Sequence, residues 1–195
     1  SNTESRIFIS GPAGSGKELV ARQIHKQSLR ANKPFVVVNG ALLDPQKYES
    51  ELFGVENTNE TINYGFFEKA TDGTLLIDEV SEIPLETQAK ILRVLIDQKF
   101  RRVNGVKEIN VNIRIISTSS KNIRDEIDKG NFREDLYHRL NVVPIFIPPL
   151  KERSEDIPLL LNYFSKKISE INGINEVKLD TDFNLLYEYE WPGNV

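Results

Sequence analysis

The chain has 195 residues, of which 39% are hydrophobic and 28% are charged, a composition typical of a globular protein with one substantial core and room for a small second lobe. The net charge of −4 argues against a nucleic-acid surface, and the absence of cysteine excludes disulfides, thiolate nucleophiles and zinc-thiolate sites. No apolar run approaches the roughly 20 residues that span a bilayer, so we expect a cytoplasmic protein without a membrane partner.

The first predicted element is a short strand at residues 7–10, followed by a glycine-rich loop and a helix at 18–29. Small residues let backbone N–H groups surround an anion, and the following helix directs the positive end of its dipole there. Lys17 adds a charge that reaches the terminal phosphates. We predict a nucleotide-phosphate loop formed by Gly11, Pro12, Ala13, Gly14, Ser15, Gly16, Lys17 and Glu18. The alternative is a helix C-cap followed by a flexible loop.

Further short runs rich in β-branched residues predict strands that are buried on both faces, at residues 35–38, 75–78, 113–118 and 142–147. Helical periodicity occurs between them, most clearly at residues 85–97. This alternation predicts the α/β class, with a five-stranded parallel sheet sandwiched by helices and a ligand at the carboxyl ends of the strands.

The helical patterns also predict which residues face the core. They are Leu19, Val20, Ala21 and Ile24 in the first helix and Ala89, Leu92, Leu95 and Ile96 in the second. Residues 57–65 are polar and show neither period, so we expect a surface loop, and the segment after Phe100 predicts a hairpin.

The dipeptide Pro148-Pro149 ends the last predicted strand and marks a boundary. We therefore expect an α/β core at residues 1–150 and a partial helical lid at residues 151–195, with helices at 157–171 and 181–189. Because methionine is absent even at position 1, we expect the chain to be a fragment of a longer protein.

Two adjacent carboxylates, Asp78 and Glu79, end the predicted strand at 75–78. Downstream of a phosphate loop, this pattern predicts that Asp78 holds Mg²⁺ and that Glu79 orients or deprotonates an attacking water. The alternative is a solvated pair of acids at the end of a strand.

Three more side chains are candidates for the functional site, and each has an alternative structural role. Asn39 ends the second strand and is equally compatible with a turn before Gly40. Arg133 and Arg139 stabilise transferring phosphate if supplied by a neighbouring subunit, or else pair with nearby surface acids. If residues 131–141 form one helix, their spacing of six residues puts the two guanidinium groups roughly 120° apart, so they cannot face the same point.

These residues together resemble the central AAA+ ATPase domain of the NtrC family, bacterial activators of sigma-54 RNA polymerase. The resemblance is carried by Gly11–Glu18, Glu51–Gly54, Gly73–Glu79, Pro84–Leu95, Phe132–Val142, Pro148–Arg153 with Glu155–Ile157, and Trp191–Val195. It covers nearly the whole chain and implies a P-loop NTPase AAA+ fold with a truncated C-terminal helical lid.

The resemblance implies further roles. The family itself carries Glu after the P-loop lysine, so Glu18 fits it, and Mg²⁺ then depends more on Asp78 and water. It implies that Asn39 pairs with Glu79 as a switch. It also implies that Arg133 and Arg139 act as arginine fingers across a ring interface. The family's sensor position falls on Ser120, whose short hydroxyl implies slow hydrolysis.

Family activators grip sigma-54 with a Gly-Ala-Phe-Thr-Gly-Ala loop, and residues 55–64 lack it. The chain therefore looks like the NtrX branch of response regulators, and we do not expect a standard sigma-54 activator. The branch implies a homo-oligomeric ring or dimer, a sensor kinase that acts through a receiver domain, and DNA bound through a C-terminal domain, both outside this chain.

The sequence thus predicts an ATPase that binds ATP and Mg²⁺ between subunits and converts ATP and water to ADP and phosphate. The alternative is a non-catalytic nucleotide-binding and oligomerisation module of a DNA-binding regulator, which the lost loop and Ser120 favour.

Overall fold

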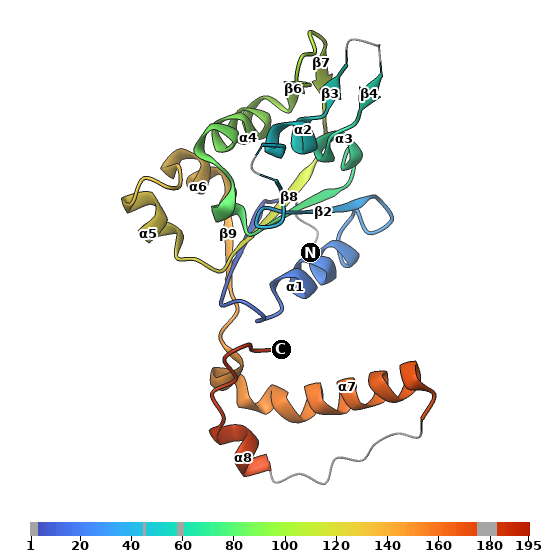
Figure 1. Ribbon diagram of the computed structural model, residues 1–195, viewed down its shortest axis with the longest axis vertical. Coiled ribbons are helices and arrows are strands. Elements are labelled where there is room, and N and C mark those ends of the chain that lie inside the picture. Colours follow the sequence, from blue (N-terminus) through green and yellow to red (C-terminus); the bar gives the residue numbers. More distant parts are fainter. Residues whose placement is uncertain (1–3, 45, 58–60, 175–182) are drawn as a thin grey trace. The chain divides into compact units, whose positions relative to one another are not determined.

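The computed structural model describes residues 4–44, 46–57, 61–174 and 183–195 (Figure 1). The chain forms two compact units. The first comprises Ser1–Gly11 and Lys17–Phe146, and the second comprises Pro12–Gly16 and Ile147–Val195. No helix among the described residues combines the length and apolar character needed to cross a membrane.

A five-stranded parallel sheet organises the first unit, in the order β2-β5-β8-β1-β9. Its strands are β1 (Ile7–Ser10), β2 (Phe35–Asn39), β5 (Thr74–Asp78), β8 (Arg114–Ser119) and β9 (Val143–Phe146). The predicted strands and their parallel arrangement are confirmed. Because all five run in one direction, their carboxyl ends share one edge of the sheet, and Asn39 lies in register with Asp78.

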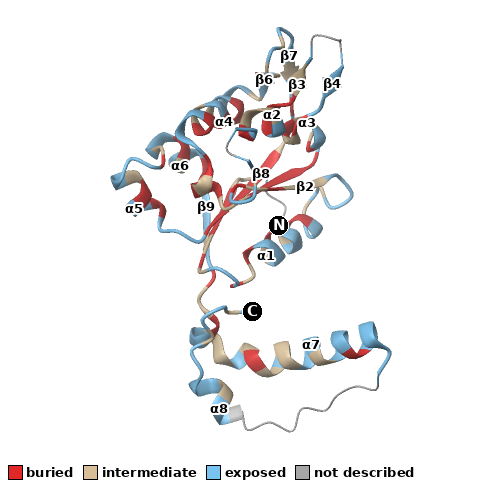
Figure 2. Ribbon diagram, in the orientation of Figure 1, coloured by how far each residue is buried: buried red, intermediate tan, exposed pale blue. Residues whose placement is uncertain are grey.

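The central strands are buried on both faces, as their continuous apolar runs predict (Figure 2). Leu75, Leu76 and Ile77 of β5 are fully buried. The edge strand β9 is more exposed, and it contains Pro144, which has no N–H to donate and is tolerated because β9 pairs on one side only.

Two helices differ from the expected facing. Helix α1 (Lys17–Lys26) buries Ala21 and His25, whereas Leu19 is 73% exposed. His25 is buried because its Nδ1 lies 3.0 Å from the Thr74 hydroxyl, a partner that apolar periodicity does not register. The prediction that Leu19 faces the core is wrong.

Helix α4 (Leu85–Asp97) has the predicted bounds but a shifted inner face. It buries Ile91, Val94 and Leu95, and the predicted core residue Ile96 is 53% exposed. Shorter helices complete the first unit: α2 (Tyr48–Phe53), α3 (Phe66–Lys69), η1 (Val80–Glu82), α5 (Ile123–Asp128) and α6 (Glu134–Leu140).

Two antiparallel hairpins lie beside each other in the first unit (Figure 1). Strands β6 (Lys99–Arg101) and β7 (Glu108–Asn110) form the predicted hairpin after α4. Strands β3 (Val55–Glu56) and β4 (Ile62–Asn63) form a second hairpin where we expected an irregular loop. That expectation is wrong for Ile62–Asn63, which form β4, whereas Asn57, Thr61 and Tyr64 are exposed and lie outside any helix or strand, as expected; residues 58–60 lie outside the described residues.

The two hairpins are joined by backbone and side-chain contacts. The Glu56 N–H donates to the Val103 carbonyl at 3.0 Å. The Arg102 guanidinium donates to Glu56 at 2.7 Å and to both oxygens of Glu68, at 2.8 and 2.6 Å. These two acids raise the pKa of Arg102, so the guanidinium stays charged although it is largely buried.

The second unit contains η2 (Leu150–Asp156), α7 (Ile157–Asn172) and α8 (Phe183–Glu188). Helix α7 confirms the predicted helix at 157–171; it has Pro158 in its first turn and ends at Gly173, which adopts φ +63°. Helix α8 falls within the predicted 181–189 segment, of which residues 181 and 182 lie outside the described part.

We expect Arg102→Ala to lower the free energy of unfolding by about 2 kcal/mol, because Glu56 and Glu68 lose their counter-charge in a site with little water. The loss is smaller than for a fully buried ion pair, because the Glu56 side chain is 28% exposed. Urea unfolding measures this change. Arg101→Ala is the matched control, since Arg101 is 60% exposed in its pair with Glu108, and should change stability little. Equal effects of the two substitutions would contradict the proposed importance of burial.

Candidate functional site

Asp78 lies at the carboxyl end of β5 and is held by both neighbouring strands. The Thr118 hydroxyl of β8 donates to Oδ1 at 2.6 Å, and Nδ2 of Asn39 of β2 donates to Oδ2 at 2.8 Å. Burial raises the pKa of Asp78 above its ordinary value, and the neighbouring Glu79 carboxylate adds to this rise, while the Thr118 hydrogen bond and Lys17 oppose it. The chain therefore holds a carboxylate at the sheet edge in a fixed orientation.

Glu79 follows in a left-handed conformation, with φ +52°. Its N–H donates to the Thr118 hydroxyl at 3.0 Å. Its Oε2 accepts 2.8 Å hydrogen bonds from both the N–H and the hydroxyl of Ser120, and its Oε1 lies 3.2 Å from Nζ of Lys17. Each carboxylate oxygen thus has a separate partner.

Lys17 is 6% exposed and also donates to the Gly11 carbonyl at 3.0 Å. Its ammonium therefore bridges the end of β1 and the Glu79 carboxylate. A lysine that serves phosphate groups must exchange part of this internal pairing for the ligand, because both oxygen partners compete for the same donors.

Asn39 does not make the contact implied by the family resemblance. Its amide donates to Asp78 rather than to Glu79, and its Oδ1 accepts from the Ala41 N–H at 2.9 Å. The implied Asn39–Glu79 pairing is therefore wrong for this structure. The physical reason is register: Asn39 lies opposite Asp78, and the left-handed turn at Glu79 carries its side chain to Lys17 and Ser120.

Thr118 is a site residue that sequence reasoning missed. Its hydroxyl accepts from the Glu79 N–H and donates to Asp78, so one side chain positions both acids. The signal was present as polar residues at 117–120 that end an apolar strand.

The two candidate arginines lie at opposite ends of α6. Arg133 immediately precedes the helix, and its guanidinium pairs with Asp135 at 3.0 and 2.7 Å, as the local-pairing alternative proposed. Arg139 lies in the last turn, is exposed, and makes no hydrogen bond or ion pair within the described part of the chain. Because the helix begins at Glu134, the single helix at 131–141 and its 120° separation do not occur.

The predicted phosphate loop leads from β1 into α1. Gly14 and Gly16 adopt φ +72° and +96°, conformations that favour glycine, and the Ser15 N–H donates to the Pro12 carbonyl at 3.2 Å. Ala13 is exposed, and Glu18 is directed to the surface of α1, where it pairs with Arg22 at 2.6 Å. Glu18 therefore has a partner of its own on the helix surface.

No group of three or more His, Cys, Asp or Glu side chains that could hold a metal exists among the described residues. Asp78 alone still fits Mg²⁺, because this ion is commonly held by one carboxylate together with substrate phosphates and water. The two oxygens of Asp78 face neutral donors, Asn39 and Thr118, so no cation already satisfies them.

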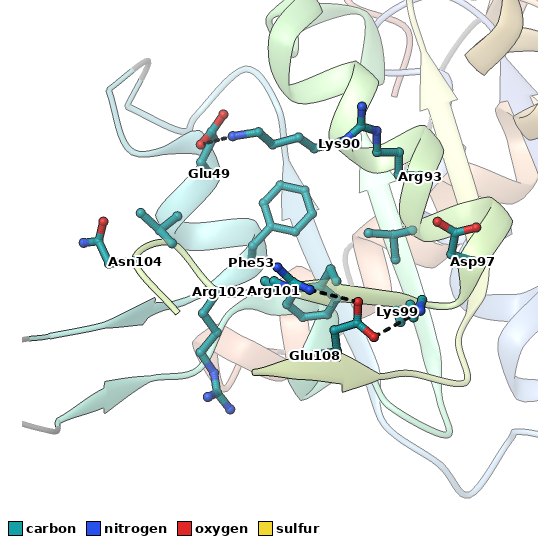
Figure 3. A pocket seen from close by; sticks show the side chains of 13 residues that line it. Glu49, Phe53, Lys90, Arg93, Asp97, Lys99, Arg101, Arg102, Asn104 and Glu108 are labelled. Atoms are coloured by element: carbon teal, nitrogen blue, oxygen red, sulfur yellow. Dashed lines mark hydrogen bonds and ion pairs between the residues drawn. The ribbon is translucent and has the colours of Figure 1, made fainter. Parts of the chain in front are cut away.

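A pocket of about 530 Å³ lies apart from these residues, between α2, α4 and the β6–β7 hairpin (Figure 3). Phe53, Val94, Phe100 and Val103 form its apolar part. Its charged side chains largely pair with one another, as in Lys90 with Glu49 at 2.5 Å and Lys99 with Glu108 at 3.0 Å. None of the predicted site residues lines it.

Comparison with protein families identifies both parts of the chain. Residues 1–146 match the sigma-54 interaction domain, and residues 151–195 match the AAA+ ATPase lid domain. The chain belongs to the sigma-54 interaction domain family. The resemblance to NtrC-family regulators and the α/β AAA+ fold expected from it are thereby confirmed.

Individual relatives point to the NtrX branch. The chain is 49% identical over 195 residues to the nitrogen assimilation regulatory protein NtrX of Azorhizobium caulinodans, covering 99% of this chain and 43% of that protein. The crystal structure of NtrX from Brucella abortus is 52% identical, with a TM-score of 0.93, and the alignment covers 98% of this chain and 44% of that one. Its complex with ATP is 51% identical, with a TM-score of 0.91 and the same coverage. The chain thus spans less than half the length of these relatives.

We expect a double-mutant cycle of Lys17→Met and Glu79→Gln in this sigma-54 interaction domain to give a favourable coupling of about 1–2 kcal/mol in the absence of nucleotide, because the two side chains form a mostly buried ion pair. Urea unfolding of the four proteins measures it. Methionine keeps the apolar stem of Lys17, and glutamine keeps an acceptor for Ser120. Additive effects within about 0.3 kcal/mol would contradict the pair.

Proposed function

We propose that the chain is an ATP-binding and ATP-hydrolysing regulatory domain. Gly11 to Lys17 bind the phosphates, Asp78 holds Mg²⁺, and Glu79 activates the water that converts ATP to ADP and phosphate. The observation that carries this proposal is the buried Lys17–Glu79 pair beside a positioned Asp78, at the carboxyl edge of a parallel sheet. The existence of Brucella NtrX structures in complex with ATP and with ADP supports it.

The internal contacts suggest the order of events at Glu79. When Lys17 turns to the phosphates, Oε1 of Glu79 loses its ammonium partner and becomes available to a water, while Ser120 continues to hold Oε2. A carboxylate with one fixed and one free oxygen is a suitable general base. A bound Mg²⁺ would neutralise developing phosphate charge, and Asn39 and Thr118 fix the orientation of Asp78, the residue that would hold this ion.

Supply of an arginine by a neighbouring subunit completes the proposal. Arg139 is exposed and has no partner within the described residues, so it is available to a second copy. Arg133 must first leave Asp135, so we assign it the secondary role. Self-association as a ring or dimer follows from this requirement.

We further propose that this domain acts within a longer response regulator, through a receiver domain that responds to a sensor kinase and a domain that binds DNA. The relatives include response regulators and a DNA-binding transcriptional regulator, of which the chain covers 41–42%. Residues 55–64 lack the family's sigma-54-gripping hexapeptide, so we propose a role other than standard sigma-54 activation.

The pairing of Glu79 with Lys17 and Ser120 also favours a second candidate, a non-catalytic module in which nucleotide controls only assembly. In that case Glu79 stays paired when nucleotide binds. A water then never replaces Lys17 at Oε1 of Glu79, and ATP is not hydrolysed.

We expect Lys17→Ala to abolish ATP binding, because the buried ammonium is lost, and Glu79→Gln to retain binding but lower turnover at least about 100-fold, because the general base is lost. Isothermal titration calorimetry and phosphate release measure the two quantities in the full-length protein. Lys26→Ala, in the exposed last turn of α1, is the control. If Lys17→Ala binds ATP as tightly as the unmodified protein, the proposed site is contradicted. If the unmodified protein binds ATP but does not hydrolyse it, the non-catalytic module is supported.

The raised pKa of Asp78 predicts that the effect of Mg²⁺ on ATP affinity depends on pH. Because its pKa is raised above 3.8, protons compete with Mg²⁺ for Asp78 at a higher pH than for an ordinary aspartate. We expect the gain in ATP affinity caused by Mg²⁺ to shrink as the pH falls from about 7.5 to about 5.

Titrations with Mg²⁺ and with EDTA at each pH measure this gain. Asp78→Asn provides the baseline, because it lacks the Asp78 carboxylate, so that its remaining pH dependence comes from ATP and from the other titrating groups. An identical pH dependence of wild type and variant would contradict the role of Asp78.

A further inference from the structure

The second unit holds three successive carbonyls of the phosphate loop. Nδ2 of Asn194 donates to the Ala13 carbonyl at 2.7 Å, the Val195 N–H donates to the Gly14 carbonyl at 3.0 Å, and Nη2 of Arg153 donates to the Ser15 carbonyl at 2.7 Å. All these residues belong to the same compact unit as Pro12–Gly16.

Asn194 is suited to this contact by both its backbone and its side chain. It adopts φ +62°, a left-handed conformation that asparagine tolerates better than most residues. While Nδ2 donates to Ala13, Oδ1 accepts from the Leu150 N–H at 2.8 Å. Only a side-chain amide offers a donor and an acceptor on this short stem, so an aspartate cannot replace both contacts.

The glycine at position 14 makes the close approach possible. A Cβ placed on Gly14 would lie 2.0 Å from the Gly193 carbonyl oxygen, and Gly14 also has φ +72°. Any side chain there would separate the loop from the 193–195 turn. Gly14 therefore serves contact with this turn as well as access for an anion.

The carbonyl contacts determine where the N–H groups of the loop point. In a planar trans peptide, the carbonyl and the following N–H are directed oppositely. Asn194 therefore orients the Gly14 N–H through the Ala13 carbonyl, and Arg153 orients the Gly16 N–H through the Ser15 carbonyl. Neither glycine N–H has an acceptor among the described residues, whereas the Ser15 N–H already donates to Pro12. Both are free to bind an anion.

We propose that Asn194, supported by Arg153, is a positioning residue for nucleotide phosphates. It holds the carbonyl side of the loop, so that the Gly14 and Gly16 N–H groups face the phosphate before the ligand arrives. This inference rests on the proposed function, because it assigns the donors that the phosphates use. Preorganised donors raise affinity because no ordering cost remains to be met on binding.

The test measures, in the full-length protein, the Kd of ATP and of inorganic tripolyphosphate for wild type, Asn194→Gly and Asn194→Asp. Glycine keeps the left-handed backbone, and aspartate keeps the acceptor for Leu150, but both lose the donor to Ala13. We expect each variant to raise both Kd values roughly tenfold and by the same factor, since the lost interaction concerns phosphate alone.

The equal loss of ATP and tripolyphosphate affinity is the readout that a merely structural role would not move, and amide hydrogen exchange without nucleotide shows where the loop changes. Exchange of the Ser15 N–H, which donates to the Pro12 carbonyl, should accelerate in both Asn194 variants, and exchange in α7 should stay unchanged. Asn172→Ala is the matched control, because it removes an exposed 2.8 Å amide–carbonyl bond within α7 of the same unit. It should alter neither affinity nor loop exchange.

Arg153→Met gives an independent variant that keeps the aliphatic stem and loses the donor to Ser15. It should weaken tripolyphosphate binding even if an Asn194 variant fails to fold. If the wild type binds ATP and the folded Asn194 and Arg153 variants bind it with the same Kd, the inference is overturned and the proposed function remains intact. Failure of wild type to bind ATP overturns the proposed function itself.

Discussion

The parallel register of β2, β5 and β8 is the constraint on which the site depends. It places Asn39, Asp78 and Thr118 side by side at one edge of the sheet, so that an amide and a hydroxyl hold the same carboxylate from opposite sides. The apolar interiors of these strands make the register costly to shift, because a slip of one residue would exchange the side chains that pack on the two buried faces and so disrupt the packing of both.

The left-handed turn after β5 directs the side chains of Asp78 and Glu79 to different partners. Asp78 stays with neutral partners, whereas Glu79 is directed to the ammonium of Lys17 and the hydroxyl of Ser120. Two adjacent acids therefore have different electrostatic surroundings. This difference suits the separate tasks of holding a cation and accepting a proton.

The sequence predicted the features that depend on local composition. The apolar runs identified all five strands, and the small residues with Lys17 identified the loop. Contacts that depend on tertiary geometry were missed. The partner of Asn39 depends on strand register, the burial of His25 on the Thr74 hydroxyl and a backbone hydrogen bond with Lys33, and the position of Arg133 on where α6 begins. The β3–β4 hairpin was missed because its strands have two residues each, too few for a periodic signal.

The network around Arg102 has a mechanical consequence. Glu56 and Arg102 are 46 residues apart in the chain, yet their ion pair and the shared Glu68 join the β3–β4 and β6–β7 hairpins. Because the Arg102 guanidinium bonds both oxygens of Glu68, it restricts rotation of the two side chains as well as their separation, so the joined hairpins move as one body. Because β6 follows α4 directly, a displacement of that helix is transmitted to both joined hairpins.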